Sequence, residues 1–127
     1  MTTPIHGIHT IGVPVSDQDK ALAFYVDVLG FEKRLDMPVE QLGSRWIEVA
    51  PVGFPVTVAL IQATEYTEPG REVGIRFTTA DAVALHARLA AAGVTVGELL
   101  DWPGVPPMFT FRDQDDNGLE IVQADPV

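Results

Sequence analysis

The chain has 127 residues, of which 46% are hydrophobic and 20% are charged. This length and this balance are typical of one globular domain with a real core, and they exclude a disordered chain. The 18 acidic and 8 basic residues give a formal net charge of −10. Nucleic acids and anionic membranes both require a basic surface, so the charge predicts that neither is a partner.

Other classes are excluded by what the sequence lacks. With no cysteine, disulfides and thiolate chemistry are excluded. The first ten residues, MTTPIHGIHT, have neither the charged start nor the apolar run of a secretory signal. No apolar stretch approaches the roughly 20 residues that a membrane span needs. We therefore expect a cytoplasmic protein.

The first half of the chain predicts a strand, a helix and three further strands. Ile5–Val15 alternates, with Ile11, Val13 and Val15 on one face and Thr10, Gly12 and Pro14 on the other. Ser16 is positioned to cap a helix whose apolar face is Leu22, Tyr25, Val26 and Leu29, and Gly30 ends it. The strands that follow are expected at residues 31–37, 44–50 and 55–62.

The second half repeats this order. A polar connection with proline and glycine, residues 64–70, precedes a strand at 72–78 and a helix that Thr78 or Thr79 caps and that runs to Ala92. Strands are expected at 94–100, 108–112 and 119–122, and Asp113–Gly118 is a strong turn signal. A shift of 63 residues places Gly30 on Gly93 and Leu22 on Leu85. The sequence thus predicts an α+β fold of two βαβββ modules, residues 1–63 and 71–127, within a single domain over residues 1–127.

The paired modules, with PVSDQDKALAFYVDVLGFE in the first and FRDQDDNGLEIVQ at the end, resemble the vicinal oxygen chelate superfamily. This group includes glyoxalase I, extradiol dioxygenases, fosfomycin-resistance enzymes and bleomycin-binding proteins. The resemblance covers essentially the whole chain and implies curved mixed sheets that form a cup, with the helices outside. It specifies the reaction poorly, because the superfamily contains both metalloenzymes and metal-free binders.

Superfamily members that resemble glyoxalase I hold a metal with four residues, and the resemblance places these on Thr10, Glu48, Gly74 and Glu120. Both carboxylates are present and both imidazoles are missing. His9 lies one residue from the first position, where strand alternation directs it to the opposite face unless a bulge intervenes. Two glutamates with waters can hold Mg²⁺ or Ca²⁺, whereas Zn²⁺, Ni²⁺ or Fe²⁺ would lack the imidazoles. We expect no cofactor, with a divalent metal at Glu48 and Glu120 as the alternative.

Two more residues are expected on the cup face. Alternation in EVGIRF places Arg76 with Gly74, so Arg76 either neutralises Glu48 and Glu120 or reaches the rim and is solvated. A buried cluster predicts that Arg76→Ala costs on the order of 3 kcal/mol. Trp46 shares a face with Glu48 and is either an aromatic wall for a ligand or a packing residue.

Three functions are compatible with these residues. The first, which we favour, is a metal-free protein that binds a small organic molecule in a pocket formed by Thr10, Trp46, Glu48, Gly74, Arg76 and Glu120. The second is a metal-dependent lyase, isomerase or dioxygenase with an altered ligand set. The third is a metal-free enzyme that uses one glutamate with a raised pKa as a general base. The resemblance also implies a homodimer.

Overall fold

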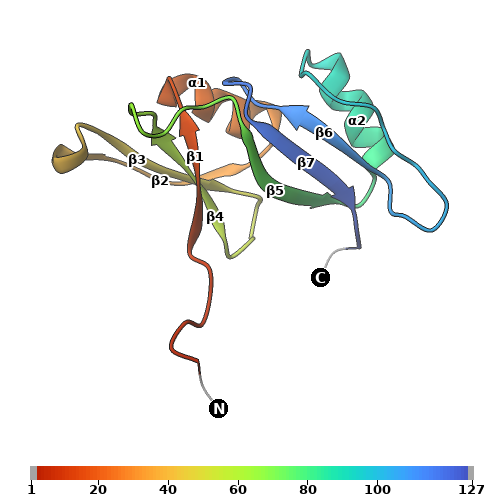
Figure 1. The fold of residues 1–127 in the computed structure, drawn as a ribbon, viewed down its shortest axis with the longest axis horizontal. Coiled ribbons are helices and arrows are strands. Elements are labelled where there is room, and N and C mark those ends of the chain that lie inside the picture. Colours follow the sequence, from red (N-terminus) through yellow and green to blue (C-terminus); the bar gives the residue numbers. More distant parts are fainter. Residues whose placement is uncertain (1–2, 126–127) are drawn as a thin grey trace. The chain divides into compact units, whose positions relative to one another are not determined.

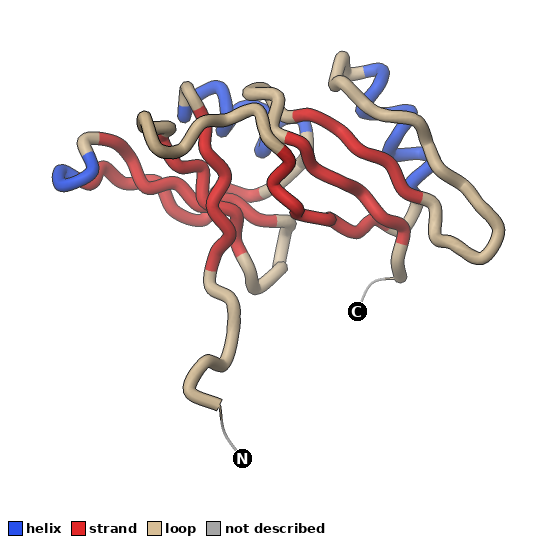
Figure 2. The backbone as a smooth tube through the Cα atoms, in the orientation of Figure 1, coloured by secondary structure: helices blue, strands red, loops and turns tan. Residues whose placement is uncertain are grey.

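The computed structural model describes residues 3–125, which form two compact units. The first unit ends at Glu68 and the second begins at Pro69, and each has its own sheet with a helix packed on one face (Figure 1). This is the α+β fold that the sequence predicts. Figure 2 shows that the strands of both sheets are joined by long loops as well as by the helices.

The first unit contains a four-stranded sheet in the order β1-β4-β3-β2. β1 runs parallel to β4, and the other neighbours are antiparallel. Its elements are β1 (Thr10–Val15), α1 (Gln18–Leu22), the π-helical turn η1 (Ala23–Val28), β2 (Glu32–Val39), the 3₁₀ turn η2 (Glu40–Leu42), β3 (Ser44–Ala50) and β4 (Thr57–Gln62).

The second unit contains a three-stranded sheet in the order β5-β7-β6. β5 is parallel to β7, and β7 is antiparallel to β6. Its elements are β5 (Glu72–Thr79), α2 (Ala82–Ala91), β6 (Met108–Arg112) and β7 (Gly118–Gln123).

Side-chain alternation gives each sheet one buried face. In the first unit Val13, Val15, Ile47, Val49 and Leu60 are fully or almost fully buried on the helix side. In the second unit the corresponding core is formed by Leu89 of α2 with Phe109, Phe111, Leu119 and Ile121. The opposite face of each sheet has no helix of its own unit packed against it, and any ligand site must be sought there.

Both predicted helix caps are wrong, because the observed N-caps lie one to three residues further along the chain. The N-cap of α1 is Asp17, whose carboxylate accepts the amides of Asp19 and Lys20. The N-cap of α2 is Asp81, which accepts the amide of Ala84. An ionised carboxylate is favoured over a hydroxyl at the positive end of the helix dipole, so aspartate takes the cap where both are available.

The first predicted helix also winds differently after its first turn. From Ala23 it continues as a π-helical turn, in which the Leu29 amide bonds to the Phe24 carbonyl oxygen at 3.0 Å. The wider winding changes which side chains face the sheet. Ala21 and Tyr25 are fully buried, whereas Leu22, Val26 and Leu29 are only half-buried.

β1 and β4 are shorter than predicted, and the strand predicted at residues 94–100 does not form. β1 begins at Thr10 rather than Ile5, because its partner β4 begins at Thr57 and the preceding Pro55 has no amide hydrogen to donate. Residues 94–100 form only the bridges Val96–Phe111 and Leu100–Met108 instead of a strand. The two bridges are four residues apart in the segment 94–100 but only three residues apart in β6. The extra residue in the segment 94–100 interrupts the ladder.

A buried glutamine fixes α1 to its sheet. The Gln18 side-chain amide donates to the carbonyl oxygens of Arg45 at 2.6 Å and Leu60 at 3.0 Å, and its oxygen accepts the Arg45 amide at 3.3 Å. Gln18 thereby satisfies backbone groups of β3 and β4 at the start of the helix. Nothing in the local sequence distinguishes this glutamine from a solvated one.

We expect Gln18→Met to lower the free energy of unfolding by about 1–3 kcal/mol, because it preserves most of the volume and leaves buried backbone groups unpaired. Urea denaturation would measure the change. Gln41→Met, which replaces an exposed glutamine, is the matched control and should have little effect. Equal stability of the two variants would contradict a structural role for Gln18.

Candidate functional site

The centre of the candidate site is the carboxylate of Glu48, in the middle of β3. Glu48 is only 6% exposed, yet its side chain points away from the helix side of the sheet. Its Oε2 accepts the indole Nε1–H of Trp46 at 2.7 Å, and its Oε1 lies 2.7 Å from the hydroxyl of Thr57. Each carboxylate oxygen therefore has a neutral donor.

Thr10 and Thr57 support this carboxylate through paired positions on β1 and β4. The Thr57 hydroxyl lies 2.7 Å from both Glu48 Oε1 and Thr10 Oγ1. Since it holds one hydrogen and an ionised carboxylate can only accept, it donates to Glu48. The Thr10 hydroxyl is then the donor within the threonine pair, to Thr57 Oγ1 or to the Thr57 carbonyl oxygen at 3.2 Å.

His9 does not lie on the helix side as alternation suggested. Its Nε2 is 3.7 Å from Glu48 Oε2, although the imidazole is 85% exposed. His9 precedes the first paired residue of β1, so the strict alternation of a strand does not govern its direction. His86, on α2, has a structural role, since its Nε2 lies 2.8 Å from the Gly97 carbonyl oxygen.

The environment of Glu48 favours the ionised carboxylate. Burial raises its pKa, but the hydrogen bonds from Thr57 and Trp46, together with the nearby His9, outweigh burial and hold the pKa of Glu48 below its ordinary value of 4.5. A general base working near neutral pH needs a raised pKa. The direction of this shift is opposite to the raised pKa of the metal-free general base that the sequence left open.

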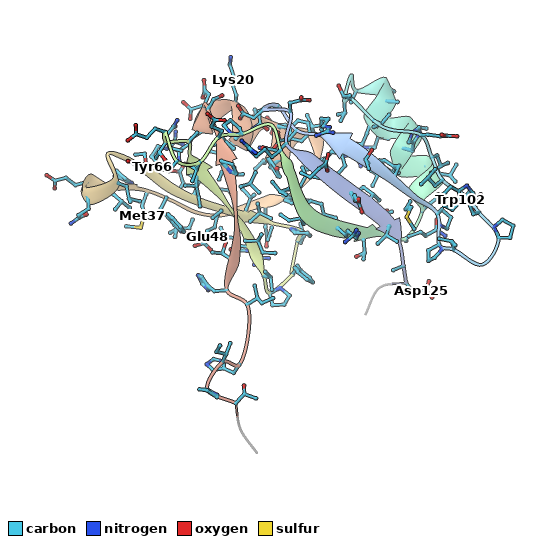
Figure 3. All side chains as sticks on the ribbon, viewed as in Figure 1. Lys20, Met37, Glu48, Tyr66, Trp102 and Asp125 are labelled. Atoms are coloured by element: carbon cyan, nitrogen blue, oxygen red, sulfur yellow. The ribbon has the colours of Figure 1, made fainter. Side chains whose placement is uncertain are left out.

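An apolar surface adjoins this carboxylate on β2. Leu35 is directly opposite Glu48, and Met37 is directly opposite Trp46, so all four side chains share one face. Leu35 is 39% exposed and Met37 is 48% exposed. Figure 3 shows Met37 and Glu48 on the side of the sheet away from α1. Leu35, Met37 and Thr57 were not identified from the sequence, because the register between strands was needed to find them.

The remaining predicted residues belong to the second unit. Arg76 and Glu120 are partners across β5 and β7, and Arg76 Nε lies 2.6 Å from Glu120 Oε2. The Arg76 side chain is 66% exposed, so within the second unit this contact is an exposed ion pair worth about 0–1 kcal/mol. Neutralisation of Glu48 by Arg76 stays a prediction.

Gly74 is not a regular strand position. It has a φ of +75°, and the register shifts between Glu72 and Arg76, where four residues of β5 advance against two of β7. Glycine adopts this left-handed conformation without the strain that a Cβ would bring. The simple alternation that grouped Gly74 with Arg76 therefore does not apply at this bulge.

The described residues do not fit the metal site of glyoxalase-like enzymes. Residues 3–125 contain no group of three or more His, Cys, Asp or Glu side chains that could hold a metal ion. Both oxygens of Glu48 already accept hydrogen bonds, and Glu120 is paired with a guanidinium. Thr10 and Gly74 offer no imidazole.

The chain belongs to the Glyoxalase/Bleomycin resistance protein/Dioxygenase superfamily, whose family model matches residues 7–121. The uncharacterized protein YurT of Bacillus subtilis (strain 168) is 34% identical over 119 residues, which cover 86% of this chain and 92% of YurT.

Two solved structures are similar over nearly the whole chain. TnmS3, described as an antibiotic binding protein from Streptomyces sp. CB03234, is 33% identical with a TM-score of 0.85 and covers 98% of this chain and 100% of its own. A superfamily member from Sphaerobacter thermophilus DSM 20745 is 33% identical with a TM-score of 0.87, and the match covers 94% of this chain and 98% of its own.

In the part of the chain that the structure describes, no helix is long and apolar enough to span a membrane.

The lowered pKa of Glu48 predicts how stability depends on pH. The folded protein binds this proton less readily than the unfolded chain, so the contribution of Glu48 to stability is present above pH 4.5 and is lost as the pH falls through the folded-state pKa. We expect the difference in unfolding free energy between the wild type and Glu48→Gln to be largest near neutral pH and to shrink in acid. Urea denaturation from about pH 7 to about pH 3 measures it.

The control is Glu65→Gln, which removes an exposed carboxylate of the same unit. The free energy of unfolding of Glu65→Gln should differ little from that of the wild type at every pH. If Glu48→Gln behaves as Glu65→Gln does, the hydrogen bonds around Glu48 do not stabilise its ionised form.

Proposed function

We propose that this protein binds a small organic molecule on the open face of its four-stranded sheet, without a metal ion. The observation that carries this proposal is the pairing across β2 and β3, which sets the exposed side chains of Leu35 and Met37 beside Trp46 and the Glu48 carboxylate. Apolar side chains left in water gain about 25 cal/mol for each Å² that a ligand covers. The buried carboxylate supplies a fixed polar group among them, as ligand sites commonly do.

Similarity supports binding rather than a particular reaction. TnmS3, which is described as antibiotic binding, is 33% identical to this chain and covers 98% of it. Binding of an antibiotic or a comparable natural product is therefore the function we infer by analogy.

The polar groups favour a site that works without metal. The resemblance places Thr10 where the glyoxalase-like enzymes have a histidine, and a neutral hydroxyl is a poor ligand for Zn²⁺ or Ni²⁺. Its hydroxyl is also engaged with Thr57. A metal-dependent lyase, isomerase or dioxygenase remains the second hypothesis, and the two retained carboxylates are its basis.

The test uses 1-naphthalenemethanol, a neutral aromatic probe, and metal-free bleomycin as a ligand of the kind that the superfamily name carries. Binding is followed by ¹⁵N–¹H NMR, with the indole N–H of Trp46 as reporter and Trp102→Phe to assign it. We expect saturable shifts of this indole signal and of the Leu35 and Met37 amides. The double variant Leu35→Ser/Met37→Ser should weaken binding roughly tenfold, because it removes apolar contact area.

Leu42→Ser is the matched control, because Leu42 is also exposed but lies in the turn η2. It should leave the affinity unchanged. Elemental analysis of the purified protein, with titrations of Mg²⁺, Mn²⁺, Ni²⁺ and Zn²⁺, tests the metal. Retention of stoichiometric metal through chelation, or probe binding that requires it, would favour the second hypothesis.

We also propose that the protein is a homodimer, as the resemblance implies. Residues 3–9 extend away from the sheet of the first unit ahead of β1 and carry the exposed side chains of Ile5 and Ile8 (Figure 1). A second copy of the chain would remove these from water. Sedimentation velocity at micromolar concentration should give a dimer, and Ile5→Ser/Ile8→Ser should shift it toward monomer. A wild-type monomer would contradict this proposal.

A further inference from the structure

A second candidate site lies wholly within the second unit. A hollow of about 220 Å³ is lined by Glu98, Leu100, Met108, Phe109, Thr110 and Glu120. Thr110 and Glu120 are partners across β6 and β7, and Leu100 bridges to Met108. The hollow therefore lies between β6, β7 and the segment that precedes the loop at residues 101–107.

Apart from Phe109, the residues of the strands that line the hollow direct their side chains away from α2. Phe109 is 2% exposed, and its ring centroid is 4.9 Å from that of His86 on α2, so this ring packs on the helix side. Thr110 is the next residue along β6 and points to the opposite face. Leu100 and Met108 give this face an apolar wall, and a methionine side chain adapts to ligands of different shape.

The charges around the hollow do not balance. Glu120 is paired with Arg76, whose Nε lies 2.6 Å from its Oε2. Glu98 is exposed, and among residues 3–125 no cationic side chain forms an ion pair with it. Two carboxylates and one guanidinium leave one negative charge beside an apolar wall at neutral pH.

We infer that the preferred ligand of this hollow is an organic cation, with an apolar body against Leu100 and Met108 and an ammonium or guanidinium group on the Glu98 carboxylate. This inference rests on the proposed function, that the protein binds a small organic molecule, and gives the second unit a site that prefers positively charged ligands. A hydrogen bond between ionised partners is stronger than a neutral one. The net charge of −10 adds to the local concentration of cations.

A divalent metal ion fits the same carboxylates less well. Glu120 is already held by a guanidinium, so a metal would have to displace Arg76 or rely on Glu98 alone. Hard cations in proteins take six or more oxygen ligands, and the other polar group that lines the hollow is the Thr110 hydroxyl.

The test compares two probes of nearly equal size, 1-naphthylmethylamine, which is an ammonium ion at pH 7, and neutral 1-naphthalenemethanol. Affinities are measured by ¹⁵N–¹H NMR titration of the full chain, with the amides of Glu98, Leu100 and Met108 as reporters. We expect the cation to bind at these residues about tenfold more tightly than the alcohol, and less tightly as salt is added.

Glu98→Gln should reduce the advantage of the cation to within about twofold and leave the alcohol unaffected. Glu65→Gln removes one negative charge from an exposed position in the other unit, and it should preserve the advantage. Equal binding of the two probes to the wild type, or an advantage that survives Glu98→Gln, would overturn the inference.

The two proposals fail in different ways. If neither probe binds anywhere, the proposed function fails. If the alcohol shifts the Trp46 and Met37 signals but the cation shows no preference for the hollow, only the choice of an organic cation fails. Stoichiometric competition by Mg²⁺ for the Glu98 signals would instead identify the hollow as a metal site and overturn the inference.

Discussion

The hydrogen bonding of the Glu48 carboxylate is the constraint on which the candidate site depends. A charge that is 6% exposed is costly unless its acceptors are satisfied, and here an indole and a hydroxyl satisfy them. These donors come from β3 and β4, and Thr10 of β1 joins them through Thr57. The positions of three strands are thus tied to one carboxylate. The charge of Glu48 is thus stabilised in the sheet by neutral hydrogen-bond donors.

The two units hold their carboxylates in contrasting ways. Glu48 is buried and bonded to neutral donors, whereas Glu120 is paired with an exposed arginine. The first arrangement fixes a carboxylate in place and keeps it ionised. The second is screened by solvent and can exchange partners at little cost. A repeated supersecondary unit therefore presents two different chemical surfaces.

Periodicity in the sequence was sufficient for the fold and for part of the site. The bounds of β3 and β6 are as predicted, and alternation along β3 correctly placed Trp46 and Glu48 on one face. The errors occur where pairing partners far along the chain decide the outcome. The direction of His9 depends on where the pairing of β1 with β4 begins, and Gly74 lies in a bulge that only the register with β7 reveals. Leu35 and Met37 belong to the site because of their cross-strand neighbours, which no local pattern specifies.

The residue at position 10 affects the chemistry that this site can support. An imidazole at this position would offer a nitrogen lone pair to a metal while its other nitrogen remained free to bond elsewhere. A threonine hydroxyl is instead engaged within the sheet, where it bonds to Thr57 and so supports the donor that holds Glu48. The carboxylate and its neighbours then form a closed set of hydrogen bonds, with exposed apolar side chains beside it. Under the proposed function, such a surface would select a ligand mainly by shape and apolar area.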